Sequence, residues 1–458
     1  CACLVGSEMC IRDRVITYGT YDLLHYGHIR LLKRAKALGD YLIVGVTADS
    51  FDVARGKINV RQTLMERIEA VKATGLADEI VIEEYEGQKI DDIRRFGVDI
   101  FAIGSDWKGH FEYLKEFCKV VYLDRTQGIS SSELRAEKRE LRIGLVGESG
   151  ILNKFEKESG FVNGVKIVGV CTQAESELSE CLRNLPVKTN SLEILLENVD
   201  AIYIVSVPLK HYEQIKKALQ KGKHVLCESP IAINTDNLKE LRILAEENKC
   251  ILMDSIKTAF STAYYRMLLL AKSGVIGRIV SVDSVCTSLS DLELKKEKEL
   301  SNTWNSICAW GPTAMLPIYQ LLGTSYRSKN IISHFDEELE NFDLFTKITY
   351  VYSDAVASLK VGKGAKSEGE LIISGTKGYI YVPAPWWKTD YFEVRFENPV
   401  NNKRYFYQLD GEGIRYEILS FVKSIETLTG NSYIDDGISE AIVQTIADFY
   451  SHNDVITI

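Results

Sequence analysis

The sequence lacks several features typical of membrane, secreted or nucleic-acid-binding proteins. No apolar run approaches the ~20 residues that a bilayer-spanning helix needs. The 458 residues carry a formal net charge of -9, so there is no basic surplus to attract nucleic acid or an anionic membrane. The ten cysteines are scattered without C-x-x-C pairs or metal-ligand spacing, which favours reduced thiols. We therefore expect a cytoplasmic protein with no membrane insertion and no nucleic-acid partner.

The first 13 residues, CACLVGSEMCIRD, lack the features of a natural start. They begin without Met, and they have neither the long apolar region nor the small-residue cleavage site of a signal peptide. The string LVGSEMCIRDR resembles the translated read-through of a sequencing adaptor. We exclude residues 1–13 from fold reasoning and expect the native protein to start near Arg14, with its own initiator Met lost.

What the sequence does contain is enough length and apolar surface for two or three domains, with 45% hydrophobic and 26% charged residues. Its first part alternates short β-rich runs with helical patterns. Because ligands of a doubly wound parallel sheet bind beyond the carboxyl ends of the strands, we look for the site there. The expected strands are 15–20, 41–47, 79–82, 99–103 and 120–123, and the expected helices lie near 27–38, 64–73, 90–96 and 111–117.

The stretch VITYGTYDLLHYGHIRLLKRAKAL, residues 15–38, has the pattern strand, tight turn, helix. His25 and His28 fall at the turn and at the first helical residues. A helix N-terminus offers unpaired N–H groups and a positive partial charge, and Gly27 leaves room for a phosphate to approach the backbone. Two imidazoles there could neutralise charge on a phosphorus centre under attack. The alternative is that both are ordinary turn and helix-start residues.

This stretch resembles the G-T-F-D-x-x-H-x-G-H signature of the nucleotidyltransferase superfamily, and specifically the glycerol-3-phosphate cytidylyltransferase family, with Tyr21 in place of Phe. RTQGISSSEL, residues 125–134, is similar to that family's R-T-E-G-I-S-T phosphate-binding motif. The similarity covers about residues 15–136. It implies that a phosphate oxygen of glycerol 3-phosphate attacks the α-phosphorus of CTP, with Mg²⁺ present, and that pyrophosphate leaves without a covalent enzyme intermediate.

The resemblance also implies roles for residues at the strand ends. Lys57 and Arg67 match basic positions of the family, although each alone could be ordinary solvated surface. Asp22 and Asp106 could hold Mg²⁺, a ribose or a glycerol hydroxyl, with capping or turn formation as the alternative. Ser130 could simply cap a helix, with Glu133 completing a capping box. The catalytic set is His25, His28, Lys57, Arg67 and Arg125, and the substrate-binding set is Thr20, Tyr21, Asp22, Gly27, Asp106, Trp107, Gly128, Ile129 and Ser130; no metal ligand is assigned beyond a possible Asp22.

A second strand–helix alternation begins at LRIGLVGESG, residues 141–150, after the charged hinge AEKRE. Beyond about residue 260 the pattern becomes β-rich, and it closes with helices near 416–427 and 439–451. The fold class is therefore α/β: a doubly wound, Rossmann-like nucleotidyltransferase domain, a second Rossmann domain, and an α+β domain with a large, mostly antiparallel sheet. We expect domain boundaries at 14–137, 138–260 and 261–458.

Residues 141–458 resemble the Gfo/Idh/MocA oxidoreductases, because KGKHVLCESPIA is similar to their G-K-H-V-L-x-E-K-P-x-A. The chain nevertheless departs from the pattern at each functional point. The second strand ends in Cys171, Thr172 and Gln173, where an acidic residue would bind ribose. Serine, alanine and threonine cannot easily replace Lys and His as proton donors at neutral pH. In the glycine fingerprint Gly147 is kept, but Ser149 and Leu152 stand in place of the second and third glycines. In E-K-P Glu228 is kept, but Ser229 stands in place of lysine. In the segment similar to L-D-x-G-x-H-x-x-D the acidic and basic positions are Ala309, Thr313 and Leu316.

Two hypotheses follow for this second half. It is either an inactive oxidoreductase-like domain that positions or oligomerises the transferase, which we favour, or an active NAD(P)-dependent reductase that makes the polyol phosphate acceptor. Lys257 or Lys210 at the nicotinamide face would favour the reductase. For the whole chain we predict a CTP:glycerol-3-phosphate cytidylyltransferase that supplies CDP-glycerol for a teichoic-acid-like or capsular polymer and forms a homo-oligomer. Another polyol or sugar phosphate as acceptor, and ATP as nucleotide, remain open.

Overall fold

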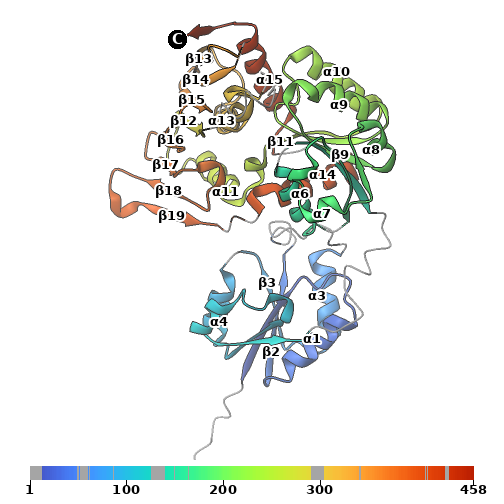
Figure 1. Cartoon of the computed structure of the whole chain (residues 1–458). Helices are drawn as coiled ribbons and strands as arrows, with labels where there is room; N and C mark the ends of the chain where they lie inside the picture. Colours follow the sequence, from blue (N-terminus) through green and yellow to red (C-terminus); the bar gives the residue numbers. More distant parts are fainter. Residues whose placement is uncertain are drawn as a thin grey trace, which may run out of the picture. The chain divides into compact units, whose positions relative to one another are not determined.

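The structure, a computed structural model, divides the chain into two compact units, Cys1–Glu140 and Leu141–Ile458 (Figure 1). Each unit is described by itself. The adaptor-like residues 1–12 lie outside the part that the structure describes. The described residues are 13–48, 51, 60, 62–85, 87–124, 140–148, 150–162, 164–289, 304–339, 342–407, 409, 411–428 and 433–458.

The first unit contains a five-stranded parallel sheet, with the strand order β3-β2-β1-β4-β5. The order reverses between β1 and β4, so the loops after these two strands flank the switch point where ligands bind in such sheets. The strands are β1 (Arg14–Gly19), β2 (Tyr41–Thr47), β3 (Glu79–Glu83), β4 (Ile100–Gly104) and β5 (Lys119–Leu123), and the helices are α1 (Tyr26–Lys36), α3 (Leu64–Ala73), α4 (Gln88–Phe96) and the 3-10 turns η1 (Ser105–Trp107) and η2 (Glu112–Glu116).

Both faces of this sheet are covered, because successive side chains of a strand point to opposite faces. Val15 belongs to a core cluster with Leu32 of α1 and Val71 of α3. Its neighbour Ile16 belongs to another, with Ile93 of α4. Figure 1 shows the same arrangement, with α1 and α3 on one side of the blue sheet and α4 on the other. The predicted doubly wound domain is confirmed, although the helix expected over 111–117 is a short 3-10 segment.

The second unit begins with a six-stranded parallel sheet of order β11-β10-β9-β6-β7-β8, whose switch point lies between β6 and β9. The predicted second Rossmann sheet is therefore confirmed, with one extra short edge strand, β8. Its strands are β6 (Leu141–Gly147), β7 (Val165–Cys171), β8 (Val187–Thr189), β9 (Ala201–Val205), β10 (His224–Glu228) and β11 (Leu252–Ser255), and its helices are α6 (Ile151–Ser159), η3 (Glu175–Glu177), α7 (Glu180–Arg183), α8 (Leu192–Asn198), α9 (Pro208–Gln220), α10 (Thr235–Glu247) and η4 (Lys257–Phe260).

A nine-stranded, mostly antiparallel sheet follows, in the order β19-β18-β17-β16-β12-β15-β14-β13-β20, with α13 packed on its central strands. Strands β13, β19 and β20 were not expected from the sequence; β19 and β20 are edge strands. The elements are α11 (Thr262–Lys272), β12 (Ile279–Thr287), α13 (Ser306–Leu322), β13 (Ser328–Phe335), β14 (Asp343–Val351), β15 (Val356–Gly362), β16 (Leu371–Gly375), β17 (Tyr379–Val382), η5 (Trp386–Lys388), β18 (Tyr391–Arg395), η6 (Pro399–Asn401), β19 (Lys403–Phe406), η7 (Gly411–Gly413), α14 (Ile414–Thr427), α15 (Asp436–Tyr450) and β20 (Val455–Thr457).

The last two long helices join this large sheet to the second Rossmann sheet. Val443 of α15 is part of the Rossmann core cluster, and α14 packs against α6. Because these helices return to the Rossmann sheet, residues 141–458 form one compact unit rather than two separate ones.

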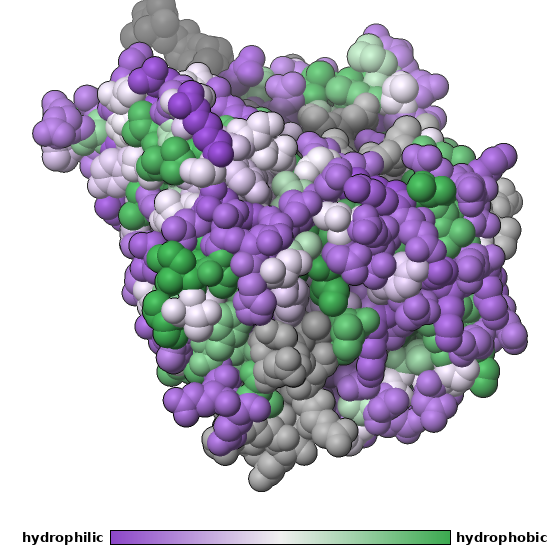
Figure 2. Space-filling model, turned by 90° about the horizontal axis from the view of Figure 1, so that it is seen from above, coloured by the Kyte–Doolittle hydropathy of each residue, from purple (hydrophilic) through white to green (hydrophobic). Residues whose placement is uncertain are grey.

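The surface drawn in Figure 2 intersperses small hydrophobic groups among hydrophilic residues. Among the helices that the structure describes, none has the length and apolarity to cross a bilayer.

Candidate functional site

The two histidines of the signature lie together at the start of α1. His25 is the N-cap residue, and its Nδ1 accepts a hydrogen bond of 3.1 Å from the Gly27 backbone N–H. The ring centroids of His25 and His28 lie 4.0 Å apart, and the planes differ by 25°. Because Nδ1 accepts this hydrogen bond, a neutral His25 carries its proton on Nε2, which is then the donor nitrogen of the ring. The positive end of the helix and an imidazole N–H thus lie within one turn of chain.

Tyr21 supports this pair from the side of the core. Its backbone has a φ of 54°, its side chain is 2% exposed, and its ring stands edge-on to His28 at a centroid distance of 5.5 Å. A Cβ at Gly19 would lie 2.9 Å from the Tyr21 ring, so the glycine of the signature makes room for that ring. The structure therefore places Tyr21 as a packing residue behind His28, and a contact between Tyr21 and substrate stays a prediction.

Asp22 joins the loop after β1 to the start of α3. It is 1% exposed, and its Oδ1 accepts a 3.0 Å hydrogen bond from the Gln62 backbone N–H. The Gln62 side chain in turn accepts a 2.7 Å hydrogen bond from the Leu23 N–H. The competing interpretation of Asp22, turn formation, accounts for these bonds, and its predicted role toward Mg²⁺ or a hydroxyl remains untested.

Arg67 is completely buried, which the sequence did not indicate. Its Nη1 donates hydrogen bonds of 2.8 Å to the carbonyls of Thr20 and Thr47, and its Nε donates one of 3.1 Å to that of Gln62. These carbonyls follow β1, end β2 and precede α3. A buried guanidinium therefore holds three segments around the predicted site in register.

A buried polar cluster that we did not predict lies beside these strand ends. Lys89 of α4, 7% exposed, forms an ion pair with Glu83 at the end of β3, and Thr47 donates a 3.0 Å hydrogen bond to the same carboxylate. Tyr18 donates a 2.8 Å hydrogen bond to Asp92, and the Lys89 Nζ lies 4.8 Å from the Tyr18 ring centroid. Burial, followed by the charge of Asp92, raises the pKa of Tyr18 well above its ordinary value. The available signal was a polar stripe at helical spacing in α4, namely Gln88, Lys89 and Asp92.

The loop after β4 contributes Asp106 and Trp107, both in η1. Asp106 is exposed, and the partly exposed Trp107 ring packs against His110 and Phe111 at centroid distances of 5.5 and 5.8 Å. Because β4 pairs with β1, this loop and the histidine loop leave neighbouring strand ends. The remaining predicted site residues, Lys57, Arg125, Gly128, Ile129 and Ser130, lie outside the described residues, as does the predicted capping box.

Within the residues that the structure describes, no three His, Cys, Asp or Glu side chains are grouped so that they could hold a metal ion. The described part of the first site therefore consists of a histidine pair, a helix N-terminus and exposed Asp106. The histidine pair and the helix N-terminus can stabilise negative charge that develops on a phosphoryl oxygen.

In the second unit, Gly147 ends β6 with a φ of 132°, and a Cβ there would lie 2.6 Å from the Val205 carbonyl oxygen. The close approach of the neighbouring strand β9 therefore requires a glycine here, independently of any ligand. Ser149 lies outside the described residues. Leu152 is buried in α6, and Ala309, Thr313 and Leu316 lie on α13.

Glu228 and Ser229 keep the end of β10 polar. Glu228 accepts a 2.5 Å hydrogen bond from the Tyr203 hydroxyl, and Ser229 precedes a cis proline. Burial raises the pKa of Glu228. Lys257, at the start of η4, is close enough for its charge to oppose that rise, whereas Lys210 is an exposed residue of α9. The structure therefore brings one lysine, Lys257, to the edge where the lysine of E-K-P is missing.

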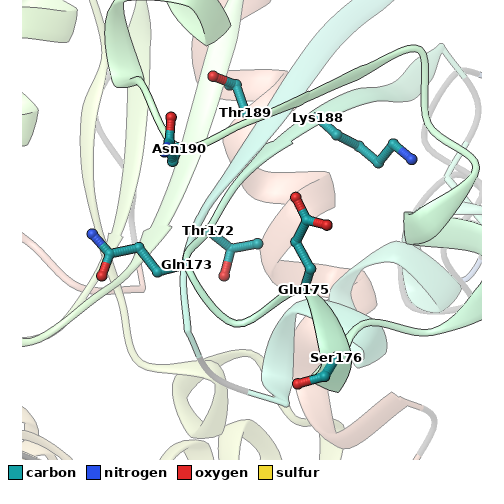
Figure 3. A pocket seen from close by; sticks show the side chains of 7 residues that line it. All are labelled: Thr172, Gln173, Glu175, Ser176, Lys188, Thr189 and Asn190. Carbon is teal, nitrogen blue, oxygen red and sulfur yellow. The ribbon is translucent and has the colours of Figure 1, made fainter.

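A pocket with a volume of about 670 Å³ lies at the carboxyl ends of β7 and β8 (Figure 3). It is polar, and Thr172 and Gln173 occupy the place where an acidic residue would bind a ribose. The full lining consists of Thr172, Gln173, Glu175, Ser176, Lys188, Thr189 and Asn190.

Comparison with known proteins agrees with this division. Residues 16–137 match the cytidylyltransferase-like family, and residues 141–255 match the oxidoreductase family with an NAD-binding Rossmann fold. The glycerol-3-phosphate cytidylyltransferase of Bacillus spizizenii is 46% identical over 128 residues, which cover 28% of this chain and 98% of that protein.

The second unit has more distant relatives. The scyllo-inositol 2-dehydrogenase (NADP(+)) of Bacillus subtilis is 24% identical over 242 residues, covering 52% of this chain and 64% of that protein. A solved 3-ketoreductase from Actinomadura kijaniata, in complex with NADP and TDP-benzene, has a TM-score of 0.61 at 14% identity over 70% of this chain and 100% of that one; this likeness shows the fold alone. Through its first unit the chain belongs to the cytidylyltransferase-like family as a nucleotidyltransferase related to glycerol-3-phosphate cytidylyltransferases, and it continues into an oxidoreductase-family domain.

Proposed function

We propose that the first unit is a CTP:glycerol-3-phosphate cytidylyltransferase, which forms CDP-glycerol and pyrophosphate. The observation that carries this proposal is the stacked His25–His28 pair at the N-terminus of α1, beside the switch point of the sheet. The relative from Bacillus spizizenii supports the choice of acceptor, since this chain spans nearly all of that protein.

In the proposed reaction a phosphate oxygen of glycerol 3-phosphate attacks the α-phosphorus of CTP in line with the departing pyrophosphate. The N–H groups at the start of α1 and the donor nitrogens of His25 and His28 stabilise the charge on the equatorial oxygens. Arg67 acts as a positioning residue, because its guanidinium is occupied by carbonyls of the surrounding loops. Mg²⁺ bound to the CTP phosphates would neutralise part of their charge, with Asp22 as the candidate protein ligand.

The test is release of pyrophosphate by the full chain, measured with CTP and with ATP against a panel of phosphorylated polyols. We expect turnover with CTP and glycerol 3-phosphate. Turnover with ATP alone would overturn the cytidylyl assignment, and turnover with a different polyol phosphate alone would overturn the acceptor. CDP-glycerol made in this way would supply a teichoic-acid-like or capsular polymer from the cytoplasm.

For the second unit we propose a non-catalytic role in positioning or oligomerising the transferase. The positions where its family carries proton donors hold Ser229, Ala309 and Thr313. The polar pocket after β7 favours dinucleotide binding as a second candidate function. Its residues Thr172 and Gln173 could form hydrogen bonds with ribose hydroxyls. NAD(P)H fluorescence titration of the full chain distinguishes the two. Absence of binding would remove the dinucleotide-binding candidate, and absence of both binding and turnover would also remove the reductase.

A further inference from the structure

Three lysines of the second unit converge on one carboxylate. Glu412, in η7, accepts hydrogen bonds of 2.9, 3.0 and 3.2 Å from the Nζ atoms of Lys154, Lys257 and Lys388. The lysines come from three elements, α6, η4 and η5. Burial opposes the ionisation of Glu412, but hydrogen bonds from the three lysines and the charge of Lys257 outweigh it and lower the pKa of Glu412 to about 2. One negative charge thus faces three positive charges at this carboxylate, and Glu228 is a second carboxylate close enough to interact with Lys257.

The loop that carries Glu412 is held in an unusual conformation. Gly411, Glu412 and Gly413 have φ values of 59°, 54° and 90°, and the middle residue of the three is not a glycine. A left-handed non-glycine residue costs about 1 kcal/mol or more, so the lysines hold Glu412 against a local preference. A Cβ at Gly413 would lie 2.1 Å from the Lys257 carbonyl oxygen, which shows how closely the loop approaches η4. The flanking glycines allow this loop to adopt other backbone conformations.

Buried polar atoms without partners lie next to Lys257. Glu417, in the first turn of α14, is 0% exposed, and neither of its carboxyl oxygens has a hydrogen bond within the described part of the chain. The same is true of the side-chain oxygens of Ser229 and Ser255. Burial, followed by the charge of Glu228, raises the pKa of Glu417 far above its ordinary value, while the neighbouring Ser255 hydroxyl and then the charge of Lys257 oppose the rise. A carboxyl group in its protonated form offers both a donor and an acceptor.

Unsatisfied buried polar atoms are rare in native proteins, and several in one place call for an explanation. Ser229 follows β10, Ser255 ends the neighbouring strand β11, and Glu417 lies in the first turn of α14, which packs against η4 directly after β11. Hydroxyl groups of a ligand would satisfy them, since a hydroxyl both donates and accepts. Lys257 connects these atoms to the lysine cluster around Glu412.

We propose that Glu412 occupies the place of a ligand's phosphate, and that this group of lysines and buried polar side chains binds a polyol phosphate. A phosphate monoester carries about -1.5 to -2 charges at pH 7, so it matches three lysines better than a single carboxylate does. On binding, Glu412 leaves the lysines, the phosphate takes its place, and the hydroxyl groups reach Glu417 and Ser255. Lys154 and Lys388 have side chains that are 51% and 36% exposed, so the phosphate can approach them from solvent.

The proposal is tested on the full chain by hydrogen–deuterium exchange of residues 411–418 during a titration with glycerol 3-phosphate. This readout is confined to the second unit, so binding to the first unit does not contribute to it. The choice of this probe rests on the proposed function. Glu412→Gln should lower the half-saturating concentration by about tenfold, because the competing charge is removed, and Lys388→Met should raise it by about tenfold.

Lys157→Met is the matched control, because Lys157 is an exposed lysine one turn further along α6 from Lys154. It should leave the titration unchanged, and thermal midpoints report whether each variant is folded. No change in exchange with glycerol 3-phosphate, or equal half-saturation for wild type and Glu412→Gln, would overturn the proposal. Equal potency of inorganic phosphate would overturn the hydroxyl contacts, and equal potency of glycerol would overturn the phosphate contact. Pyrophosphate release is assayed separately with CTP, so failure of the proposed function is seen independently of this site.

Discussion

The two parallel sheets of this protein have similar architecture, but they differ in how many motif residues of their families they keep at the strand ends. Each has its switch point beside the first strand of its unit, and in each a glycine ends that strand, Gly19 in β1 and Gly147 in β6. The first sheet keeps a stacked histidine pair beyond that glycine. The second keeps Glu228 of its motif but carries Ser229 in place of lysine. The comparison teaches that one doubly wound architecture can carry different side chains at the ends of its strands.

The largest effect should come from the histidine pair. We expect His28→Ala to lower kcat for pyrophosphate release by about 10²–10³-fold, because donors aimed at a phosphoryl centre typically contribute that much. The measurement is steady-state pyrophosphate release, with circular dichroism to confirm an intact fold. His334→Ala, an exposed histidine of β13 in the second unit, is the control and should leave the rate unchanged. Equal rates for wild type and His28→Ala would show that the role of the histidine is misassigned.

The second prediction concerns Gly147, the glycine that ends β6, and the stability of the second unit. Gly147→Ala places a Cβ 2.6 Å from the Val205 carbonyl oxygen at a left-handed φ, so we expect a loss of about 2–4 kcal/mol in the free energy of unfolding of that unit. Tryptophan fluorescence during denaturation reports it, since four of the five tryptophans lie in the second unit.

Gly150→Ala is the matched control for this experiment. Gly150 has a φ of -58°, and no heavy atom would lie within 4 Å of its Cβ. Its effect should be smaller than about 1 kcal/mol. Similar losses for the two variants would contradict the steric argument at Gly147.

The stability of the second unit should depend on pH through one buried carboxyl group, Asp254. Burial raises the pKa of Asp254 to about 6, although a hydrogen bond from Ser439 opposes the rise. Because the pKa in the folded state exceeds that in the unfolded state, the protonated group stabilises the fold below about pH 4, and this contribution is lost as the pH rises through about 6. Asp254→Asn should remove about 2–3 kcal/mol of this pH dependence between pH 4.5 and 7.5.

Tryptophan fluorescence during denaturation at the two pH values checks this prediction. Exposed Asp390→Asn is the control and should leave the pH dependence as in the wild type. An Asp254→Asn variant whose stability still falls between the two pH values as steeply as the wild type would contradict the assignment to Asp254.

The smallest expected effect concerns helix capping in the first unit. Thr63 caps α3 in a full capping box with Glu66, so Thr63→Ala should cost about 1 kcal/mol, seen as a lower temperature of half-inactivation of pyrophosphate release. Ser191, the N-cap of α8 in the second unit, makes no capping hydrogen bond through its side chain. Ser191→Ala should therefore cost the second unit clearly less, and an equal cost would contradict the capping argument.

Much of the fold could be predicted from local patterns. The helix expected over residues 64–73 coincides with α3, and buried runs such as 41–47 coincide with β2 because both faces of a parallel sheet demand apolar residues. The short strands β8 and β20 escaped prediction, since three residues at an edge carry little hydrophobic periodicity.

The candidate site could be predicted only in outline. The spacing of His25 and His28 on a strand–turn–helix pattern placed both rings at one helix end, where the structure finds them stacked. The burial of Arg67 and the ion pair between Lys89 and Glu83 could not be predicted. Arg67 bonds to backbone carbonyls up to 47 residues away, and Glu83 and Lys89 meet only because the end of a strand packs against a helix. Such contacts depend on how elements pack, and sequence spacing does not encode that.

The sequence by itself determined the order of the two units, the parallel sheets and the residue types present at each strand end, because hydrophobic periodicity and turn chemistry act over short spans of chain. The tertiary structure decided which charged groups face solvent and which face one another. It buried the Arg67 guanidinium among carbonyls, and it gathered Lys154, Lys257 and Lys388 from three elements around Glu412. The physical reason is that a charge interacts through space with whatever the fold brings near it, however far apart the residues lie along the chain.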